Sequence, residues 1–486
     1  MARFVAPALS MLFWALLALN IVSSGIQSMC YDGRFTPDSI FYADAAQNIA
    51  SGRGITNSMR TLHERGIALP RPLTMWGPLY PLAIAAVTLS GLSAPAAALL
   101  LAAVFGGILL VGCYVLCRQL YDADVAMVGV AFLLYFQPFL LVIKHAWSET
   151  MGLSLAVLGF VVLVQARRTD RRSIALGLIF GGGLLLGLSS ITRYALIPLL
   201  PVATTLLLPR WDGNTLTLGG LFTQAVIRVL VAKGLLLGAG AGIFVVPVVA
   251  RSIYYTGQMG TVGGRVFDID LVETLLRFLH AIRESLRLPG GLGSVALLVL
   301  LCGVLVHAKS YWKSGGRAWC HTIFLDRSRY LLWICGGGYI LFLLYTQTRV
   351  RVDAIGARLL FPGTLFLFLY LVATLAHLSR WPAVLRMSIA IVLLSVIAYV
   401  QTPMALMVLH AKTTAPHDYR AHGARIESVQ KLAEISSDKD LILAEDAINL
   451  TLYLGPRDVI FFRPAFVARE QLSFEKVSEI LRAEGT

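Results

Sequence analysis

Charged side chains are scarce in this chain: Asp, Glu, Lys and Arg make up 14% of its 486 residues, whereas soluble domains carry about 25%. Together with a mean hydropathy of +0.74, this shortage excludes a cytosolic enzyme, a disordered chain and a fibre. Apolar runs recur from residue 8 to residue 408 without a polar interruption as long as a soluble domain. The composition therefore predicts one polytopic membrane domain, residues 1–408, followed by a small polar domain, residues 409–486.

Cysteine is also scarce. Its six copies form no CxxC pair, and most of them lie inside apolar runs or basic loops, so neither a disulfide framework nor a zinc site is expected. Acids and bases are nearly absent from the interior of the apolar runs, with Lys233 as the exception near the end of one run. Because ion-coupled transporters place such groups along their transport path, this absence weighs against that class.

The net charge of +14 includes two basic clusters that lie between apolar runs, one at residues 167–172 and one at residues 309–329. Under the positive-inside rule, such clusters are cytoplasmic loops rather than a nucleic-acid groove. This assignment places the N-terminus in the cytoplasm. It places the first loop (27–77), a later loop (251–288) and the tail on the extracytoplasmic side of the cell's inner membrane.

Eleven apolar runs are predicted to span the membrane, and twelve or thirteen spans remain open. The runs are residues 8–26, 94–117, 124–142, 150–166, 173–190, 194–208, 226–250, 289–308, 330–346, 357–378 and 386–408. The first run lacks a small-residue cleavage site, so it is expected to be a retained span. Residues 78–92 are apolar but short, and a full crossing there would break the parity of the topology. We expect a re-entrant or surface-lying segment at that position.

The outer regions contain their own elements. In the tail, LILAE (441–445) and DVIFF (458–462) predict short strands beside helices, hence a small α/β appendage. In the later outer loop, residues 271–286 predict a helix with one apolar face on the membrane surface. FDID (267–270) resembles a cation-binding pattern, but helix capping explains it better. Three glycine-rich stretches predict close helix packing, at residues 181–183, 238–242 and 336–338.

Two acidic residues at the predicted outer surface are candidates for catalysis. Asp38 follows Pro37 at the start of a predicted helix, where it can cap the helix or take a proton from an acceptor hydroxyl. Glu149 begins a later span, where the helix dipole favours a carboxylate. Asp44 is six positions after Asp38, about 240° round the helix, and is expected to be solvated or paired with a loop arginine.

Basic and aromatic side chains are predicted to surround these acids. The candidates for substrate binding are Asp44, Lys144, His145, Arg193, Tyr194, Arg251 and Arg358. No second histidine lies near His145, which favours a structural role over metal binding. The three arginines stand at outer helix ends, where the positive-inside rule predicts few. Snorkelling at the interface is one explanation, and a bound phosphate anion paired with guanidinium groups is the other.

Motifs along nearly the whole chain combine into one arrangement. They are PDSIFYADAAQNIASGRGI (37–55), WGPLYPLAIA (76–85), QPFLLVIKHAWSET (137–150), TRYALIPLLP (192–201), ARLLFPGTLFLFLY (357–370) and ILAEDAINLTLYLGPRDVIFFRP (442–464). The arrangement resembles the GT-C membrane glycosyltransferases, in particular the branch of aminoarabinose transferases and protein O-mannosyltransferases. The resemblance implies an all-α polytopic fold of about 11–13 transmembrane helices, with outer-face loops and a small C-terminal α/β appendage.

The resemblance also implies a function. GT-C enzymes of this branch move a sugar from a polyprenyl-phosphate-linked donor on the extracytoplasmic face. By position, Asp38 matches the catalytic base, Glu149 matches a second acidic site, and Arg193 and Arg358 match basic positions near the lipid phosphate. This chain has Asp38-Ser39 where the mannosyltransferase branch tends to have adjacent acids. It also lacks the WWD motif of oligosaccharyltransferases, which argues against transfer to asparagine.

From these observations we predict an inverting glycosyltransferase in which Asp38 deprotonates the acceptor hydroxyl. The expected partners are the lipid-linked donor, a lipid, glycan or protein acceptor and the bilayer. No cofactor is assigned, and a divalent cation stays open because no strong ligand cluster occurs on the outer side. One alternative is a non-enzymatic translocator of lipid-linked sugars or polymers, which needs a polar pathway through the spans. A membrane scaffold is a third reading, but it gives the first-loop acid no role.

Overall fold

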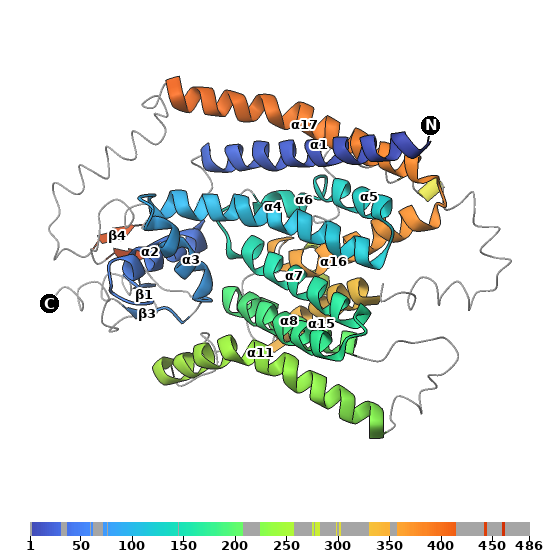
Figure 1. Ribbon diagram of the computed structural model, residues 1–486. Helices are drawn as coiled ribbons and strands as arrows, with labels where there is room; N and C mark the ends of the chain where they lie inside the picture. Colours follow the sequence, from blue (N-terminus) through green and yellow to red (C-terminus); the bar gives the residue numbers. More distant parts are fainter. Residues whose placement is uncertain are drawn as a thin grey trace, which may run out of the picture.

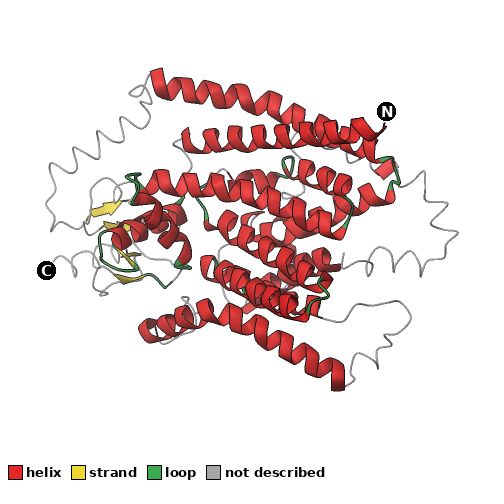
Figure 2. Ribbon diagram, viewed as in Figure 1, coloured by secondary structure: helices red, strands yellow, loops and turns green. Residues whose placement is uncertain are grey.

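The computed structural model describes most of the membrane domain and two strands of the tail (Figure 1). The described residues are 2–30, 36–58, 60–61, 71–74, 76–143, 145–207, 224–256, 275–276, 278–281, 298, 301–302, 330–349, 357–414, 442–444 and 459–461. Helices dominate them (Figure 2), as expected for an all-α polytopic protein.

The main helices are α1 (Ala2–Cys30), α2 (Pro37–Ala50), α3 (Leu79–Thr88), α4 (Ala94–Leu120), α5 (Ala123–Leu133), α6 (Gln137–Ile143), α7 (Ser148–Arg168), α8 (Arg172–Thr192), α9 (Leu199–Thr204), α11 (Gln224–Thr256), α15 (Tyr330–Arg349), α16 (Ala357–Leu378) and α17 (Ala383–Thr414). Two 3₁₀ turns flank α9, namely η1 (Tyr194–Leu196) and η2 (Thr205–Leu207). The strands are β1 (Thr56–Asn57), β2 (Arg60–Thr61), β3 (Arg71–Pro72), β4 (Ile442–Ala444) and β5 (Val459–Phe461).

Among the described residues, seven helices are long and apolar enough to cross a membrane. They are α1, α4, α7, α8, α11, α16 and α17. Each coincides with an apolar run that was expected to span, which confirms the polytopic class. The run at 330–346 is helical in α15, although its apolar part is shorter than these seven. Most of the run at 289–308 and of the expected surface helix at 271–286 lies outside the described residues.

The span expected over residues 124–142 is broken into two helices. α5 and α6 meet at an angle of 70°, with residues 134–136 between them. Pro138 has no N–H to donate to the carbonyl of Leu134, and its ring crowds the preceding turn, so a straight helix cannot continue through this point. If the bent pair is one span, the described total is eight.

Two further apolar segments are shorter than the seven long helices. The run at 194–208, expected to span, is divided into η1, α9 and η2, because Pro198 and Pro201 each remove a backbone donor from the hydrogen-bond ladder. Its crossing stays a prediction. The helix α3 has ten residues, about 15 Å of length, which is half of what a bilayer core requires. The expectation that residues 78–92 do not cross is therefore confirmed.

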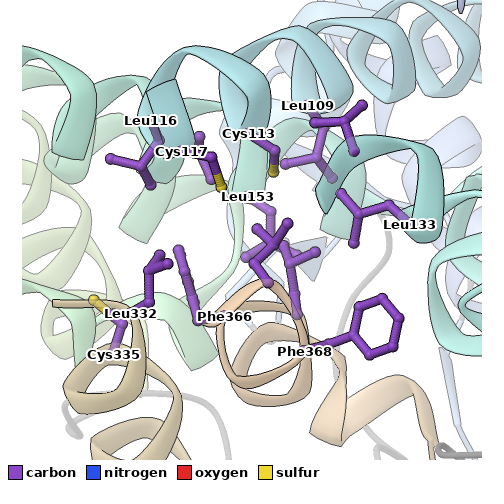
Figure 3. Close-up of a cluster of buried hydrophobic side chains, with 14 of the residues drawn as sticks. Leu109, Cys113, Leu116, Cys117, Leu133, Leu153, Leu332, Cys335, Phe366 and Phe368 are labelled. Carbon is purple, nitrogen blue, oxygen red and sulfur yellow. The ribbon is translucent and has the colours of Figure 1, made fainter. Parts of the chain in front are cut away.

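The centre of the bundle is a tightly packed apolar core. Figure 3 shows part of it, including Cys113 and Cys117 of α4, Leu153 of α7, Cys335 of α15 and Phe366 of α16. All five side chains are fully buried, and the three cysteines are free thiols. They act as small apolar core residues.

Glycines let α8 and α11 approach closely. A Cβ atom at Gly183 would lie 2.3 Å from the carbonyl oxygen of Leu237, and one at Gly240 would lie 2.4 Å from that of Phe180. Neither position accepts a larger residue unless a helix backbone moves. The packing role expected for these two glycine-rich stretches is therefore confirmed.

The short strands gather with α2 and α3 at one end of the bundle, and α1 begins at the opposite end (Figure 1). In the first loop, β1 and β3 pair in antiparallel fashion. The loop strand β2 joins the tail strands in a parallel sheet with the order β2-β5-β4. Both tail strands fall within the segments 441–445 and 458–462 that were predicted to be strands. The described parts of the first loop and of the tail thus lie on the same side of the membrane domain.

Candidate functional site

The candidate site begins at the N-terminus of α2, at the same end of the bundle. Thr36 is the N-cap, with its backbone N–H 3.3 Å from Ser39 Oγ, and Pro37 occupies the first helical position. Proline is favoured there because its fixed φ suits a helix and no donor is lost. Asp38 is therefore in the first turn rather than at the cap, and its carboxylate has a different partner.

That partner is Arg358, at the start of α16. Oδ2 of Asp38 lies 2.6 Å from Nη1 of Arg358. Nε of the same guanidinium donates to Oε1 of Glu149, and Nη1 of Arg193 lies 3.1 Å from that oxygen. We call these four residues the four-charge cluster. Its members come from α2, α7, the end of α8 and α16, and its formal charge is zero.

Exposure differs strongly within the four-charge cluster. The side chains of Asp38 and Arg358 are 24% and 22% exposed, whereas those of Arg193 and Glu149 are 13% and 0% exposed. A buried carboxylate is costly unless it is paired, and two guanidinium groups pair with Glu149. Burial acts to lower the pKa of Arg193, but Glu149 outweighs it and raises that pKa above its ordinary value. Asp38 is thus the acid that a substrate can reach, and Glu149 supports the arginines from behind.

Two atoms of the cluster have unused hydrogen-bonding capacity. Oε2 of Glu149 and Nη2 of Arg358 are buried and have no hydrogen-bond partner within the described part of the chain. Buried polar atoms in native proteins are nearly always paired. The cluster therefore retains one acceptor and one donor that its own residues do not satisfy.

Trp147 adjoins the cluster on the face of Arg358. The guanidinium carbon of Arg358 lies 4.0 Å from the centroid of the indole ring, a cation–π distance. The indole Nε1 donates to Thr36 Oγ1 at 2.6 Å. On the same ring stacks His145, with the centroids 4.3 Å apart and the planes 13° from parallel. His145 also has Nδ1 2.7 Å from the carbonyl oxygen of Leu141, which agrees with its expected structural role.

Tyr42 is fully buried on the α2 side of the site. Its hydroxyl lies 2.9 Å from Ser148 Oγ, next to Glu149 in the chain. Burial raises the pKa of Tyr42 well above its ordinary value, and Asp38 and Glu149 raise it further, although Arg193 opposes them. The phenol is therefore neutral and serves as a hydrogen-bonding group rather than as a base.

The first loop is tied to the bundle around the site. A Cβ atom at Gly77 would lie 2.2 Å from the carbonyl oxygen of Ile191, so glycine lets the loop pack against the end of α8. On the other side, Arg251 of α11 donates to the carbonyl oxygens of Leu73 at 2.6 Å and Ile55 at 2.7 Å. These contacts hold the loop in place. The Arg251 guanidinium donates to the loop backbone, so the structure gives it an anchoring role.

The structure places the remaining candidates as follows. Asp44 is 4% exposed and accepts the N–H of Ser58 at 2.7 Å, so of its two expected states, pairing with a loop arginine stays a prediction and solvation was wrong. The reason is that α2 packs against α3 and α4 while the loop folds back over it. Tyr194 follows Arg193 in η1 and is half-buried. Lys144 and the acidic pattern at 267–270 lie outside the described residues.

Sequence reasoning selected all four members of the cluster but missed their aromatic and hydroxyl neighbours, namely Thr36, Tyr42 and Trp147. A signal for Trp147 was present, because it lies two positions before Glu149 at a predicted outer helix start. No group of three or more His, Cys, Asp or Glu side chains is suitably placed for a metal ion among the residues that the structure describes.

Comparisons with known proteins support the fold. No protein-family profile matches the chain, and no curated protein matches it. Among solved structures, it is similar to ArnT from Cupriavidus metallidurans bound to undecaprenyl phosphate, with 10% identity and a TM-score of 0.56 over 96% of this chain and 88% of that chain. The likeness shows that this chain shares the fold of that protein, in agreement with the fold that the motifs predicted.

Two further structures are similar at lower scores. Apo ArnT from the same organism has 13% identity and a TM-score of 0.45, and the alignment covers 94% of this chain and 86% of that one. The Archaeoglobus fulgidus oligosaccharyltransferase tethered to an acceptor peptide has 11% identity and a TM-score of 0.49, with 93% and 64% coverage.

Proposed function

We propose that this chain, which has the GT-C fold, is a glycosyltransferase that moves a sugar from a polyprenyl-phosphate-linked donor to a hydroxyl acceptor. The observation that carries the proposal is the four-charge cluster. It holds a reachable carboxylate, Asp38, 2.6 Å from a guanidinium nitrogen of Arg358, at the end of the bundle that also bears the first loop. A base and a cation for a leaving phosphate are thereby side by side.

In the proposed reaction, the acceptor hydroxyl gives its proton to the Asp38 carboxylate while its oxygen attacks the anomeric carbon. The bond between that carbon and the phosphate oxygen breaks, and its electron pair leaves with polyprenyl phosphate. A single displacement inverts the anomeric configuration. Arg358 and Arg193 stabilise the negative charge on the departing phosphate through guanidinium hydrogen bonds. Glu149 keeps both arginines in position.

The proposed donor rests on two supports. One is the pair of arginines, whose forked donors suit phosphate oxygens. The other is that the ArnT structure with the same fold is bound to undecaprenyl phosphate, the kind of lipid phosphate that would leave from a polyprenyl-phosphate-linked sugar. The proposed acceptor class comprises lipid, glycan and protein hydroxyls. The proposed location is the inner membrane, with a cytoplasmic N-terminus and an extracytoplasmic C-terminal domain.

The translocator alternative has less support. It requires polar groups along a path through the bundle, whereas the buried acids of the described spans, Asp124 and Glu149, lie in the first turns of α5 and α7. They therefore lie near helix ends rather than at mid-membrane depth.

The direct test is sugar transfer from a polyprenyl-phosphate-linked donor by purified protein in nanodiscs. Asp38→Asn preserves the size of the side chain and one acceptor oxygen but removes the base, so turnover should fall about 10²- to 10⁴-fold. Asp122→Asn, at an exposed position before α5, serves as a matched control and should retain activity. Wild-type turnover by Asp38→Asn would exclude Asp38 as the base.

Sidedness has its own test. Ser51 is exposed at the end of α2, so a cysteine at that position should react with a membrane-impermeant maleimide added to spheroplasts. Arg171→Cys, in the exposed turn between α7 and α8, should react only after the membrane is opened. The reverse pattern would place the four-charge cluster on the cytoplasmic side and overturn the proposed topology.

A further inference from the structure

Trp147 contacts Arg358, the proposed phosphate-binding cation, and Thr36, which precedes the helical turn that carries the proposed base. Its side chain is 6% exposed and lies directly before α7, which carries Glu149. The indole ring lies against the guanidinium of Arg358, and the indole N–H donates a hydrogen bond to Thr36. Thr36 is the N-cap of α2, so it is two residues from Asp38.

The ring restricts Arg358 in a way that the ion pairs alone do not. Asp38 contacts Nη1 and Glu149 contacts Nε, which fixes two points along one guanidinium. A plane held at two edge points can still rotate about the line that joins them. The indole ring, whose centroid lies 4.0 Å from the guanidinium carbon, opposes this rotation, because a guanidinium prefers to lie over an aromatic ring. The ring thereby restricts the orientation of Nη2, which has no partner within the described chain.

The indole N–H makes a separate contribution. Its bond to Thr36 Oγ1 is 2.6 Å long, and the same oxygen lies 3.1 Å from Ser39 Oγ. The first turn of α2 is thereby connected to the residue that supports Arg358. His145, stacked on the ring at 4.3 Å, limits the movement of the indole. An apolar filler residue would need neither the N–H bond nor the cation over its face.

We propose that Trp147 is a positioning residue that sets the geometry between the Asp38 carboxylate and the Arg358 guanidinium, by its ring for Arg358 and by its N–H for the first turn of α2. This inference rests on the proposed transferase function. It assigns to Trp147 no contact with the reacting atoms. The two contributions are separable, since phenylalanine retains a ring without the N–H and leucine retains neither.

The first experiment measures transfer kinetics in nanodiscs for Trp147→Leu, Trp147→Phe, Thr36→Val and the double variant Trp147→Phe/Thr36→Val. Trp147→Leu should raise the KM for the lipid donor and lower kcat, each by about threefold to thirtyfold, the range expected for loss of a cation–π contact. A loss of folded protein would lower kcat and leave KM unchanged. Trp14→Phe, in an aromatic cluster on α1, controls for general effects and should change neither constant.

The hydrogen bond is tested by the double-mutant cycle. If the N–H acts through Thr36, the double variant should be no worse than the poorer single variant, and Thr36→Ser, which keeps the hydroxyl, should behave as wild type. Strictly additive losses, or wild-type kinetics in Trp147→Leu, would overturn the positioning role.

A second measurement does not depend on catalysis. Phenylglyoxal modifies accessible guanidinium groups, and mass spectrometry reports the rate at Arg358. Trp147→Leu should increase that rate several-fold relative to wild type and to Trp14→Phe. An unchanged rate would overturn the positioning role even if transfer is observed. Absence of transfer by the wild type, combined with faster labelling in Trp147→Leu, would instead reject the proposed function while supporting the role of Trp147 in holding Arg358.

Discussion

At one end of the bundle, Asp124 at the start of α5 pairs with Arg386 near the start of α17; at the other end, Asp38 and Glu149 share Arg193 and Arg358. The two sites are separated by the length of α16, about 30 Å. In the first pair, the two side chains are 11% and 12% exposed. In the four-charge cluster, one acid is completely buried and the other is accessible.

The two sites also differ in how completely their hydrogen bonds are satisfied. Arg386 donates to Asp124 and to the carbonyl oxygen of Ala376, so this pair fastens α5 to the turn between α16 and α17. The four-charge cluster retains the unpartnered Oε2 of Glu149 and Nη2 of Arg358 within the described chain. A pair that only joins helices gains nothing from such atoms. No side-chain atom of the Asp124–Arg386 ion pair is in this condition within the described chain, which separates the four-charge cluster from a purely structural ion pair.

The largest expected effect is on stability. Glu149→Leu removes the acid that neutralises two arginines, one of them buried, and should destabilise the protein by about 3–5 kcal/mol. Asp124→Leu leaves a single arginine, Arg386, which keeps the carbonyl oxygen of Ala376 as a partner, and should cost about 1–2 kcal/mol. Thermal unfolding of both variants in the same detergent measures the difference. Equal losses would show that the two sites are equivalent in burial and would remove the basis of the comparison.

A charge exchange separates function from stability. Asp124→Arg combined with Arg386→Asp re-forms an ion pair and should leave sugar transfer unchanged. Asp38→Arg combined with Arg358→Asp also re-forms that ion pair, but it removes the Arg358 contact to Glu149 and moves the base and the phosphate-binding cation to each other's positions. Transfer should then fall by at least about 100-fold, which is the loss expected for misplaced acid–base and electrostatic groups. Activity assays at matched amounts of folded protein provide the measurement. If the Asp38→Arg/Arg358→Asp variant retained wild-type transfer, the four-charge cluster would be only a structural contact.

The smallest effect is expected from the loop anchor Arg251. Arg251→Leu leaves the carbonyl oxygens of Ile55 and Leu73 without their guanidinium donor and should lower transfer about threefold to tenfold by loosening the first loop. Arg228→Leu, an exposed change on the same helix α11, should have no effect. Kinetics for both variants provide the check, and a loss as large as that of Asp38→Asn would move Arg251 from an anchor to a member of the site.

Part of this site was visible in the sequence. Asp38, Glu149, Arg193 and Arg358 were chosen because each is a charged residue at a predicted outer helix end. Their contacts were not predictable, since Glu149 and Arg358 are 209 positions apart and no local rule relates them. The error at Asp44 has the same origin: helix periodicity gives its direction on α2 but not the loop that covers it at Ser58.

The broken span at α5 and α6 is a different type of miss. Pro138 is visible in the sequence, but the hydrophobicity of 124–142 favoured a single helix, and local backbone chemistry overrode that pattern. The strands of the tail were the opposite case. Their β-branched and aromatic runs were sufficient to place both of them, although the pairing of β5 with β2 of the first loop required the folded chain.

The sequence by itself determined the membrane class, the positions of most helices and the charged residues at the helix ends, because hydrophobicity and charge act through the solvent that each segment must face. Only the tertiary structure decided which acid is sealed behind two arginines, which acid stays accessible, and that Trp147 lies against Arg358. Those outcomes depend on distances of a few ångström between helices far apart in the chain, and such distances are set by how the whole bundle packs.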